Sequence, residues 1–221
     1  MDWNYWGSNL IEVGLMKMKV LFAHGFEGAP DGGKPTYMRE ELGWDVVAPV
    51  MSANGWNIEQ ETRVLLEHLD SEKFDLVAGS SMGGLAAANA SRLRPEMGFG
   101  LLLIAPAFGL AEMWHERLSA DEMKQWEASD AYLYRGFELE MTLGWDFMQT
   151  AMEMSWPELN HPTVILHGLQ DDVVPIEHSR RIADCDDRVI AMIELEDGHR
   201  MQEAKSHFLQ AANLCLNSQT R

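Results

Sequence analysis

The chain has 221 residues, which is enough for one domain with a sizeable hydrophobic core. Its formal net charge is −18, and its 46% hydrophobic and 24% charged residues are ordinary for a globular protein. This acidity argues against nucleic acid as a partner, because phosphates attract basic surfaces, and against binding to anionic membrane surfaces.

Cysteine usage and the length of the apolar runs indicate the cellular compartment of the protein. Cys185 and Cys215 fit no CxxC or other metal-ligand spacing. We therefore expect neither a disulfide framework nor a zinc site, and we predict a reducing, cytoplasmic setting. No apolar run reaches the roughly 18 residues that a membrane span needs. The first residues also lack the charged start and long apolar core of a signal peptide.

Residues 1–17 form an N-terminal extension in this prediction. They precede the first predicted strand, so Met16 or Met18 is an alternative natural start. The extension contains the aromatic sequence WNYWG, and such side chains on a terminal arm can dock on a neighbouring subunit. We expect a monomer or a homodimer.

Short apolar runs then alternate with amphipathic helical patterns. The runs are apolar throughout, which is typical of strands buried on both faces. The predicted strands span residues 18–23, 44–48, 74–78, 100–105, 163–167 and 189–195. The predicted helices span residues 35–42, 58–69, 82–92, 176–183 and 202–214. This alternation predicts an α/β protein with about six mostly parallel strands and helices on both faces of the sheet.

One long stretch interrupts the alternation. No strand pattern is apparent between Ala107 and Pro162, and the stretch is helical in pattern and rich in Trp, Tyr, Phe and Met. It predicts a small helical lid at about residues 108–161, inserted into a single domain that spans residues 18–221. Its aromatic side chains either serve only to pack the lid onto the body or line a pocket as well. The two roles are compatible.

Residues 79–83 read GSSMG, which fits G-x-S-x-G between a predicted strand and a predicted helix. This pattern predicts a strained turn that holds Ser81 at the sheet edge, with flanking glycines that leave room for close backbone contacts. The helix that follows favours negative charge at its N-terminus. The alternative is a glycine-rich turn without chemistry.

A serine hydroxyl needs a base to act as a nucleophile, and in the fold with this turn the chain order is serine, acid, histidine. Residues 167–175 read HGLQDDVVP directly after a strand, and residues 196–200 read EDGHR after the last strand. Loops that follow parallel strands share one sheet edge. We therefore predict Asp171 as the acid and His199 as the base.

Two further choices accompany this prediction. Asp172 is the alternative acid, and the aspartate that is not the acid is expected to cap the helix near Pro175. His24 and His167 are expected to hold loops by hydrogen bonds.

Two backbone amides are expected to bind an oxyanion. One belongs to Met82, which follows the nucleophile, and the other to Phe26 in the HGFEG loop after the first strand. The alternative for HGFEG is a tight turn without a role. An apolar acyl or aromatic group is expected in the pocket. The candidate substrate-binding side chains are Phe26, Phe108, Trp145 and Met148.

With these motifs the chain resembles the α/β-hydrolase superfamily from residue 18 to the end. HGFEG, GSSMGG, HGLQDDVVP and DGHR carry the resemblance. The C-terminal part is similar to small abhydrolase-domain thioesterases, which remove long acyl chains from protein cysteines, and the N-terminal half is more like small bacterial esterases with an HGF loop. Two features depart from larger members. The usual antiparallel pair before the first parallel strand is shortened or missing, and HGFEG is not the HGGG form of many lipases.

The resemblance implies a serine hydrolase of carboxylic esters or thioesters that works through an acyl-enzyme, on the triad Ser81, Asp171 and His199. The expected partner is a small-molecule substrate, and no metal or organic cofactor is implied. Acyl transfer and cleavage of a carbon–carbon bond on the same triad are alternatives. A non-catalytic binding protein is a weaker one, because all three triad residues are present. The sequence leaves open the physiological substrate and the choice between oxygen and sulfur esters.

Overall fold

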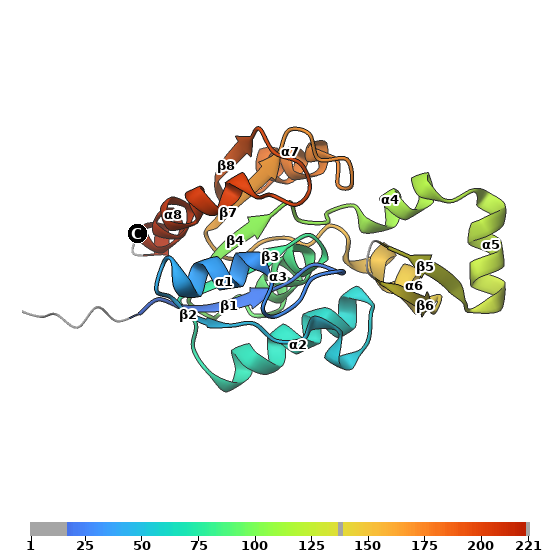
Figure 1. Ribbon diagram of the computed structural model, residues 1–221, viewed down its shortest axis with the longest axis horizontal. Coiled ribbons are helices and arrows are strands. Elements are labelled where there is room, and N and C mark those ends of the chain that lie inside the picture. Colours follow the sequence, from blue (N-terminus) through green and yellow to red (C-terminus); the bar gives the residue numbers. More distant parts are fainter. Residues whose placement is uncertain (1–16, 137–138, 220–221) are drawn as a thin grey trace, which may run out of the picture.

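Six parallel strands form the main sheet of the computed structural model, which describes residues 17–136 and 139–219 (Figure 1). The strands are β1 (Lys19–Ala23), β2 (Asp45–Val47), β3 (Leu76–Ser80), β4 (Gly100–Ile104), β7 (Thr163–Gly168) and β8 (Val189–Leu195). Their order across the sheet is β2-β1-β3-β4-β7-β8, and each neighbouring pair is parallel. The predicted strands fall on these six. The predicted parallel sheet is therefore confirmed.

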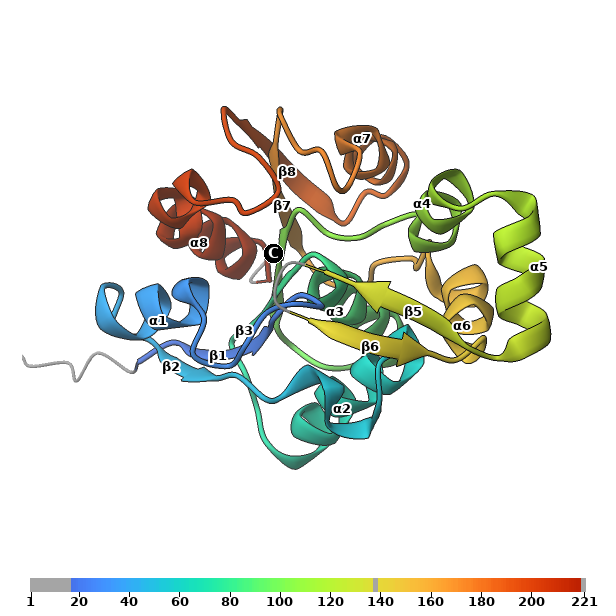
Figure 2. The same ribbon diagram turned by 45° about the vertical axis from the view of Figure 1, so that its right-hand side comes forward.

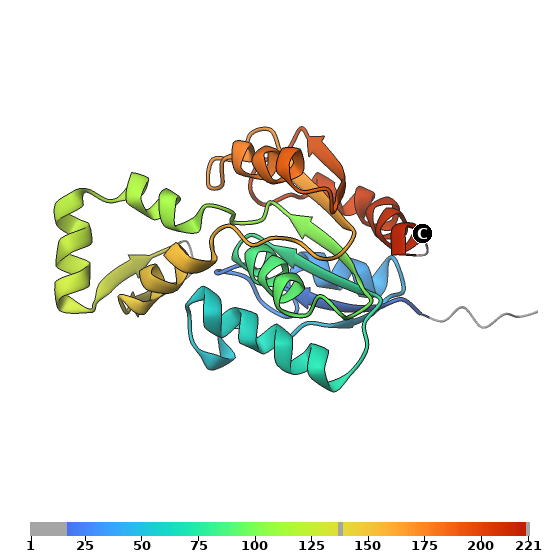
Figure 3. The same cartoon turned by 180° about the vertical axis from the view of Figure 1, so that it is seen from behind.

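Side chains of the central strands enter two separate cores because successive residues point to opposite faces. In β1, Val20 and Phe22 enter one core, while Leu21 and Ala23 enter the other. Two helices cover the first face, namely α1 (Gly33–Glu40) and α8 (Phe208–Gln219). Three cover the second face, which Figure 3 shows from behind, namely α2 (Ile58–Ser71), α3 (Met82–Leu93) and α7 (Ile176–Cys185). This layering explains why the strands read as continuous apolar runs.

The helix α2 begins where its sequence predicts a start. The Asn57 side chain accepts a hydrogen bond from the Gln60 amide, and the Gln60 side chain accepts one from the Asn57 amide. This capping box satisfies two amides that the helix itself leaves unpaired. Short 3₁₀ turns at Met51–Asn54 and Glu203–His207 complete the connections around the sheet.

The segment between β4 and β7, here called the inserted segment (residues 108–161), is not wholly helical. It contains α4 (Leu110–Arg117), α5 (Ala120–Ser129), β5 (Tyr132–Arg135), β6 (Glu140–Leu143) and α6 (Asp146–Met154). The prediction of a helical lid is wrong at residues 132–135 and 140–143, because β5 and β6 pair as an antiparallel hairpin. Figure 2 shows this hairpin running from α5 back toward the main sheet.

The hairpin forms where tertiary packing favours it. Burial alternates along β5, and Tyr132 and Tyr134 are its better buried residues. The Trp114 ring from α4 and the Tyr132 ring pack perpendicular to each other, with their centroids 5.5 Å apart. The Trp126 indole N–H of α5 donates to the Leu143 carbonyl at 3.0 Å. The aromatic residues of the segment thus join its helices to its hairpin.

Most of the predicted N-terminal extension, including the WNYWG sequence, lies outside the described residues. The docking of this extension on a neighbouring subunit therefore stays a prediction. The oligomeric state, monomer or homodimer, also stays a prediction. None of the helices in the described ranges has the length and apolarity needed to cross a bilayer.

Candidate active site

Ser81 sits at the junction of β3 and α3 in a conformation that few L-residues adopt. Its φ is 56° and its ψ is −123°, so the backbone is strained at this position. Its amide donates to the Ile104 carbonyl at 3.0 Å, and its carbonyl accepts from the Leu85 and Ala107 amides at 3.1 and 3.0 Å. These contacts from α3 and from the chain around the end of β4 hold the turn in place.

The glycines of the motif allow close backbone contacts. A Cβ atom on Gly79 would lie 2.3 Å from the Gly83 carbonyl oxygen. One on Gly83 would lie 2.4 Å from the carbonyl oxygens of Ala23 and His24. Real Cβ atoms do not approach backbone so closely, so both positions need glycine for steric reasons. The steric prediction for the motif is confirmed.

The three predicted polar residues meet through hydrogen bonds. The Ser81 hydroxyl lies 3.0 Å from His199 Nε2, and His199 Nδ1 lies 2.8 Å from Asp171 Oδ2 and 3.0 Å from Oδ1. A carboxylate only accepts, so Nδ1 carries the proton and Nε2 accepts from the Ser81 hydroxyl. These residues come from the loops after β3, β7 and β8, at one edge of the sheet.

The Asp171 carboxylate is fully buried and receives several donors. Besides His199, Oδ1 accepts from the Val173 and Val174 amides at 2.9 and 2.8 Å, and Oδ2 lies 3.2 Å from His167 Nε2. Burial by itself raises the pKa of Asp171, but hydrogen bonds from His167 and His199 outweigh burial and hold that pKa well below its usual value. The carboxylate therefore stays charged where it faces the imidazole.

A glycine lets the loop of the acid meet the loop of the histidine. A Cβ on Gly168 would lie 2.3 Å from the Asp197 carbonyl oxygen. The Leu169 amide donates to the Leu195 carbonyl at 2.8 Å, and the Gln170 amide donates to the Asp197 carbonyl at 3.0 Å. Backbone hydrogen bonds thus join the loop that carries Asp171 to the loop that carries His199.

Asp172, His167 and His24 lie near the site and differ in burial and in their hydrogen-bond partners. Asp172 is exposed, and α7 has no side-chain cap, so the expectation that Asp172 caps this helix is wrong. His167 Nε2 also lies 3.1 Å from the Val174 carbonyl, and the Met51 amide donates to His24 Nε2 at 3.2 Å. The prediction that these two histidines hold loops is confirmed.

The residues predicted to supply the oxyanion amides, Phe26 and Met82, line the same cavity as Ser81. Phe26 lies within a tight turn, since the Gly28 amide donates to the Gly25 carbonyl at 2.8 Å. A Cβ on Gly25 would lie 3.7 Å from the Ser81 hydroxyl oxygen. The loop therefore passes directly beside the Ser81 hydroxyl.

The cavity has a volume of about 740 Å³, which suits a small-molecule ligand. Of the four predicted substrate-binding side chains, only Phe26 lines it. Phe108 and Met148 are fully buried in the core, and Trp145 packs edge-on against Trp126. The sequence marks the segment as aromatic but cannot tell which rings face inward.

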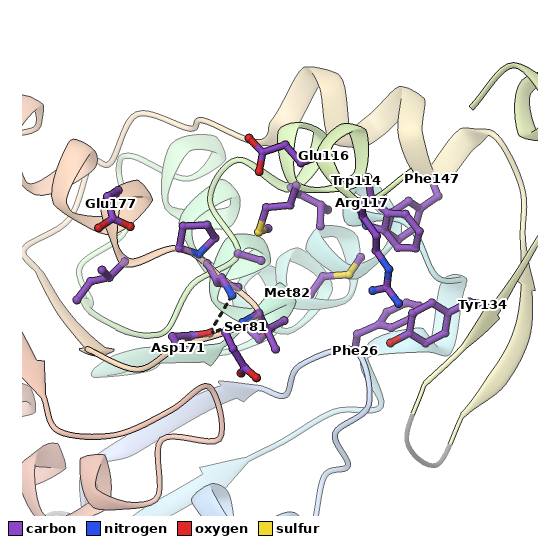
Figure 4. Close-up of a pocket in the computed structure, with 18 of the residues that line it drawn as sticks. Phe26, Ser81, Met82, Trp114, Glu116, Arg117, Tyr134, Phe147, Asp171 and Glu177 are labelled. Carbon is purple, nitrogen blue, oxygen red and sulfur yellow. Dashed lines mark hydrogen bonds between the residues drawn. The ribbon is translucent and has the colours of Figure 1, made fainter. Parts of the chain in front are cut away.

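Figure 4 shows that the two sides of this cavity differ. Asp171 and Glu177 lie on one side of Ser81, with the loop and helix that follow β7. The other side is formed by the HGFEG loop and the inserted segment, and it is mostly aromatic. Its labelled side chains are Phe26, Trp114, Arg117, Tyr134 and Phe147. Arg117 was missed by the sequence analysis, because an arginine at a helix end carries no motif.

No group of three or more His, Cys, Asp or Glu side chains is placed to hold a metal ion in the part of the chain that the structure describes. The polar atoms around Ser81 are instead engaged in the hydrogen bonds described above.

Comparison with known proteins adds a family and a fold. The model of the Uncharacterised protein family (UPF0227) matches residues 19–215. The chain belongs to this family. This UPF0227 member is 30% identical over 155 residues to mouse (Mus musculus) palmitoyl-protein thioesterase ABHD10, mitochondrial, an alignment that covers 63% of the chain and 50% of the relative. The chain thus spans about half the length of the curated relatives it matches.

Solved structures give the fold of this UPF0227 member. Alpha/beta hydrolase domain-containing protein 10 from mouse superposes with a TM-score of 0.73 at 23% identity, over 92% of this chain and 90% of that chain. Est1E from Butyrivibrio proteoclasticus, solved with ferulic acid bound, gives a TM-score of 0.68 at 16% identity, over 92% and 89%. The family member therefore has the α/β-hydrolase fold, as its motifs predict.

Proposed function

We propose that the chain is a serine hydrolase that cleaves carboxylic esters or thioesters with an apolar acyl group. The observation that carries this proposal is the hydrogen-bonded chain from Ser81 through His199 to the buried Asp171, with Ser81 in a strained turn at a cavity. A serine, a histidine and a carboxylate in this relation activate a hydroxyl for attack on a carbonyl.

The reaction would run in two halves. Ser81 Oγ attacks the carbonyl carbon while its proton passes to His199 Nε2. The tetrahedral intermediate collapses, and the bond to the leaving oxygen or sulfur breaks as His199 returns the proton to that atom. Water then attacks the acyl-enzyme, gives a proton to His199, and releases the acid as Ser81 regains its proton.

Charge in these steps would be balanced by fixed groups. The ionised Asp171 carboxylate stabilises the imidazolium form of His199 and keeps Nε2 directed at Ser81. The amides of Phe26 and Met82 would bind the oxyanion, and loss of one such donor typically costs about 10²–10³ in kcat. The N-terminus of α3 adds a favourable field at the same point.

Thioesters stand beside oxygen esters in this proposal because one relative is named a palmitoyl-protein thioesterase. The same triad can cleave a thioester or an oxygen ester, so rates on matched pairs of the two substrates decide which is preferred. We also propose a cytoplasmic location, since both cysteines are free, although the name of the same relative carries the word mitochondrial.

The test uses p-nitrophenyl esters and matching acyl thioesters of graded acyl length, with wild type beside Ser81→Ala. Loss of a triad serine lowers kcat by about 10⁶, so activity that vanishes in the variant supports the proposal. Ser80→Ala is the matched control, because Ser80 is the neighbouring serine at the end of β3, while the hydroxyl bound to His199 Nε2 belongs to Ser81. Absence of wild-type activity on every ester and thioester would overturn the serine hydrolase proposal.

A further inference from the structure

Arg117, the last residue of α4, lines the cavity that holds Ser81. Its guanidinium carbon lies 5.5 Å from the centre of the Trp114 ring and 5.9 Å from the centre of the Tyr134 ring. Stacking on aromatic rings fixes the plane of a guanidinium and leaves its edge N–H groups available to other acceptors.

The charge of Arg117 has no carboxylate partner at ion-pair distance among the described residues. Some other described arginines have one, while others, such as Arg181 over the Trp156 ring, do not. Arg135, in the same inserted segment, pairs with Glu140 at 3.0 Å, and Arg180 pairs with Glu194 at 2.8 Å. What distinguishes Arg117 is that it lines the cavity that holds Ser81. In a chain with a net charge of −18, an arginine that lines a cavity and pairs with no acid marks a place for an external anion.

Nearby acids do not take this role. Glu27 accepts a hydrogen bond from the Tyr134 hydroxyl at 2.8 Å. Glu116 lines the same cavity, but Figure 4 shows its carboxylate directed away from Arg117. Glu177 belongs to α7 and lies across the cavity, beyond Asp171.

The position of Arg117 also indicates which half of a substrate, the acyl group or the leaving group, would lie beside it. The leaving group must lie at His199 Nε2 to receive its proton, and His199 follows β8. The sheet order places β1, with Phe26 after it, on one side of β3, and β7 and β8 on the other. Arg117 gathers with Phe26 and Tyr134 on the side away from Asp171 (Figure 4), which is the side left for the acyl group.

We propose that Arg117 binds a carboxylate at the far end of the acyl group, so that the preferred substrates are monoesters or monothioesters of dicarboxylic acids. This inference rests on the proposed serine hydrolase function. The aromatic walls would hold the methylene chain, and the guanidinium would form charge-assisted hydrogen bonds with the terminal carboxylate.

The experiment compares p-nitrophenyl monoesters of adipate, suberate and sebacate with the neutral hexanoate, octanoate and decanoate esters of equal carbon number. The variants are Arg117→Met, which keeps an apolar stem, and Arg117→Lys, which keeps the charge. Arg135→Met is the matched control, because Arg135 lies in the same segment but does not line the cavity. The measured quantity is the ratio of kcat/KM for the diacid monoester to kcat/KM for its neutral match.

We expect wild type to favour the diacid monoester at one or more lengths, and Arg117→Met to lower the ratio by about tenfold through KM, as loss of a charged hydrogen bond does. Arg117→Lys keeps part of the preference, and Arg135→Met keeps all of it. Dividing by kcat/KM for the neutral ester removes any general effect of Arg117→Met on the cavity from this comparison. A wild-type preference for neutral esters at every length, or a ratio that Arg117→Met leaves unchanged, would overturn the inference.

Two further arms separate the possible failures. The hexanoate ester of para-hydroxybenzoate is compared with phenyl hexanoate, and an Arg117-dependent preference for the charged leaving group would contradict placement on the acyl side. Binding of suberate and octanoate to Ser81→Ala is measured by calorimetry. An Arg117-dependent preference for suberate supports the anion site even where no ester is cleaved, and equal binding argues against it.

Discussion

His167 Nε2 lies 3.2 Å from Oδ2 of Asp171, the same oxygen that lies 2.8 Å from His199 Nδ1. The buried carboxylate of Asp171 thus contacts a second histidine, which does not line the cavity. His167 is itself fully buried, and its Nδ1 lies 2.8 Å from the Ser179 hydroxyl of α7. The acid is therefore positioned by the body of the domain as well as by its own loop.

His167→Leu removes this second donor and should lower the free energy of unfolding by about 1–3 kcal/mol, because polar partners are left unmatched. The folded pKa of Asp171 lies below its ordinary 3.8, so its ionic stabilisation is present above that pH and is lost as pH falls through the folded pKa. The gap between wild type and variant should thus be full at about pH 7 and narrow at about pH 3 in urea unfolding. Ser179→Ala, which leaves the Asp171 contact in place, should cost less. An equal gap at both pH values would contradict this account.

Asp171→Asn and Asp172→Asn should differ sharply in turnover. An amide at position 171 removes the charge that faces His199 Nδ1, and such a change typically lowers kcat by about 10⁴. Asp172 lines the cavity but is exposed, and His199 Nδ1 is hydrogen-bonded to Asp171. The Asp172 variant should therefore keep kcat within about tenfold of wild type, because the charge that faces the imidazole is retained. Steady-state kinetics on one p-nitrophenyl ester is the measurement. Similar losses in both variants would show that the acid has been assigned to the wrong aspartate.

Gly83→Ala should destabilise the domain by about 3 kcal/mol or prevent folding, because its new methyl group would press on two backbone carbonyls. Gly98→Ala is the matched control, since a Cβ there meets nothing within 4 Å, and its effect should stay within about 0.5 kcal/mol. Thermal unfolding followed by circular dichroism gives both values. Equal melting temperatures for the two variants would refute the steric account of the turn.

Glu61 on α2 should make stability fall as pH rises. Its carboxyl is fully buried, one oxygen lacks a hydrogen-bond partner among the described residues, and burial raises its pKa from 4.5 to about 8. The native state then keeps a proton that the unfolded state releases. Its contribution is complete below pH 4.5 and is lost as pH rises through about 8.

Glu61→Gln removes that titration. The variant should gain stability relative to wild type by a few kcal/mol between about pH 5 and about pH 9. Glu127→Gln, at an exposed position of α5, should show no such trend. Urea unfolding across this range measures the effect, and parallel curves for wild type and Glu61→Gln would contradict a raised pKa.

The main sheet and the hydrogen-bonded residues Ser81, His199 and Asp171 can be predicted from the sequence more fully than the inserted segment can. Strands buried on both faces leave continuous apolar runs, and Ser81, Asp171 and His199 each follow one of them at a loop. Local pattern is enough there, because the loops after parallel strands meet at one edge.

The hairpin and the cavity wall depend on packing between distant residues. Tyr132 and Tyr134 alternate with exposed neighbours, which is a strand signal, but four residues are too few to stand out among helical patterns. Arg117 is exposed, and its place at the cavity wall depends on the Trp114 and Tyr134 rings, which come together from α4 and β5. Phe108 and Met148 show the converse, since their apolar character fits a core as well as a pocket.

The adjacency of β4 and β7 in the sheet has a consequence for how the chain can change. These strands pair directly, with Leu101 opposite Thr163, although the whole inserted segment separates them in sequence. The sheet therefore sets the spacing of Ser81, Asp171 and His199 without help from that segment. Insertions, deletions and substitutions between the two strands can remodel what the cavity admits, while the machinery beneath keeps its geometry. Under the proposed function, the residues that select a substrate and the residues that carry out the reaction would therefore lie in separate stretches of the chain and could change independently.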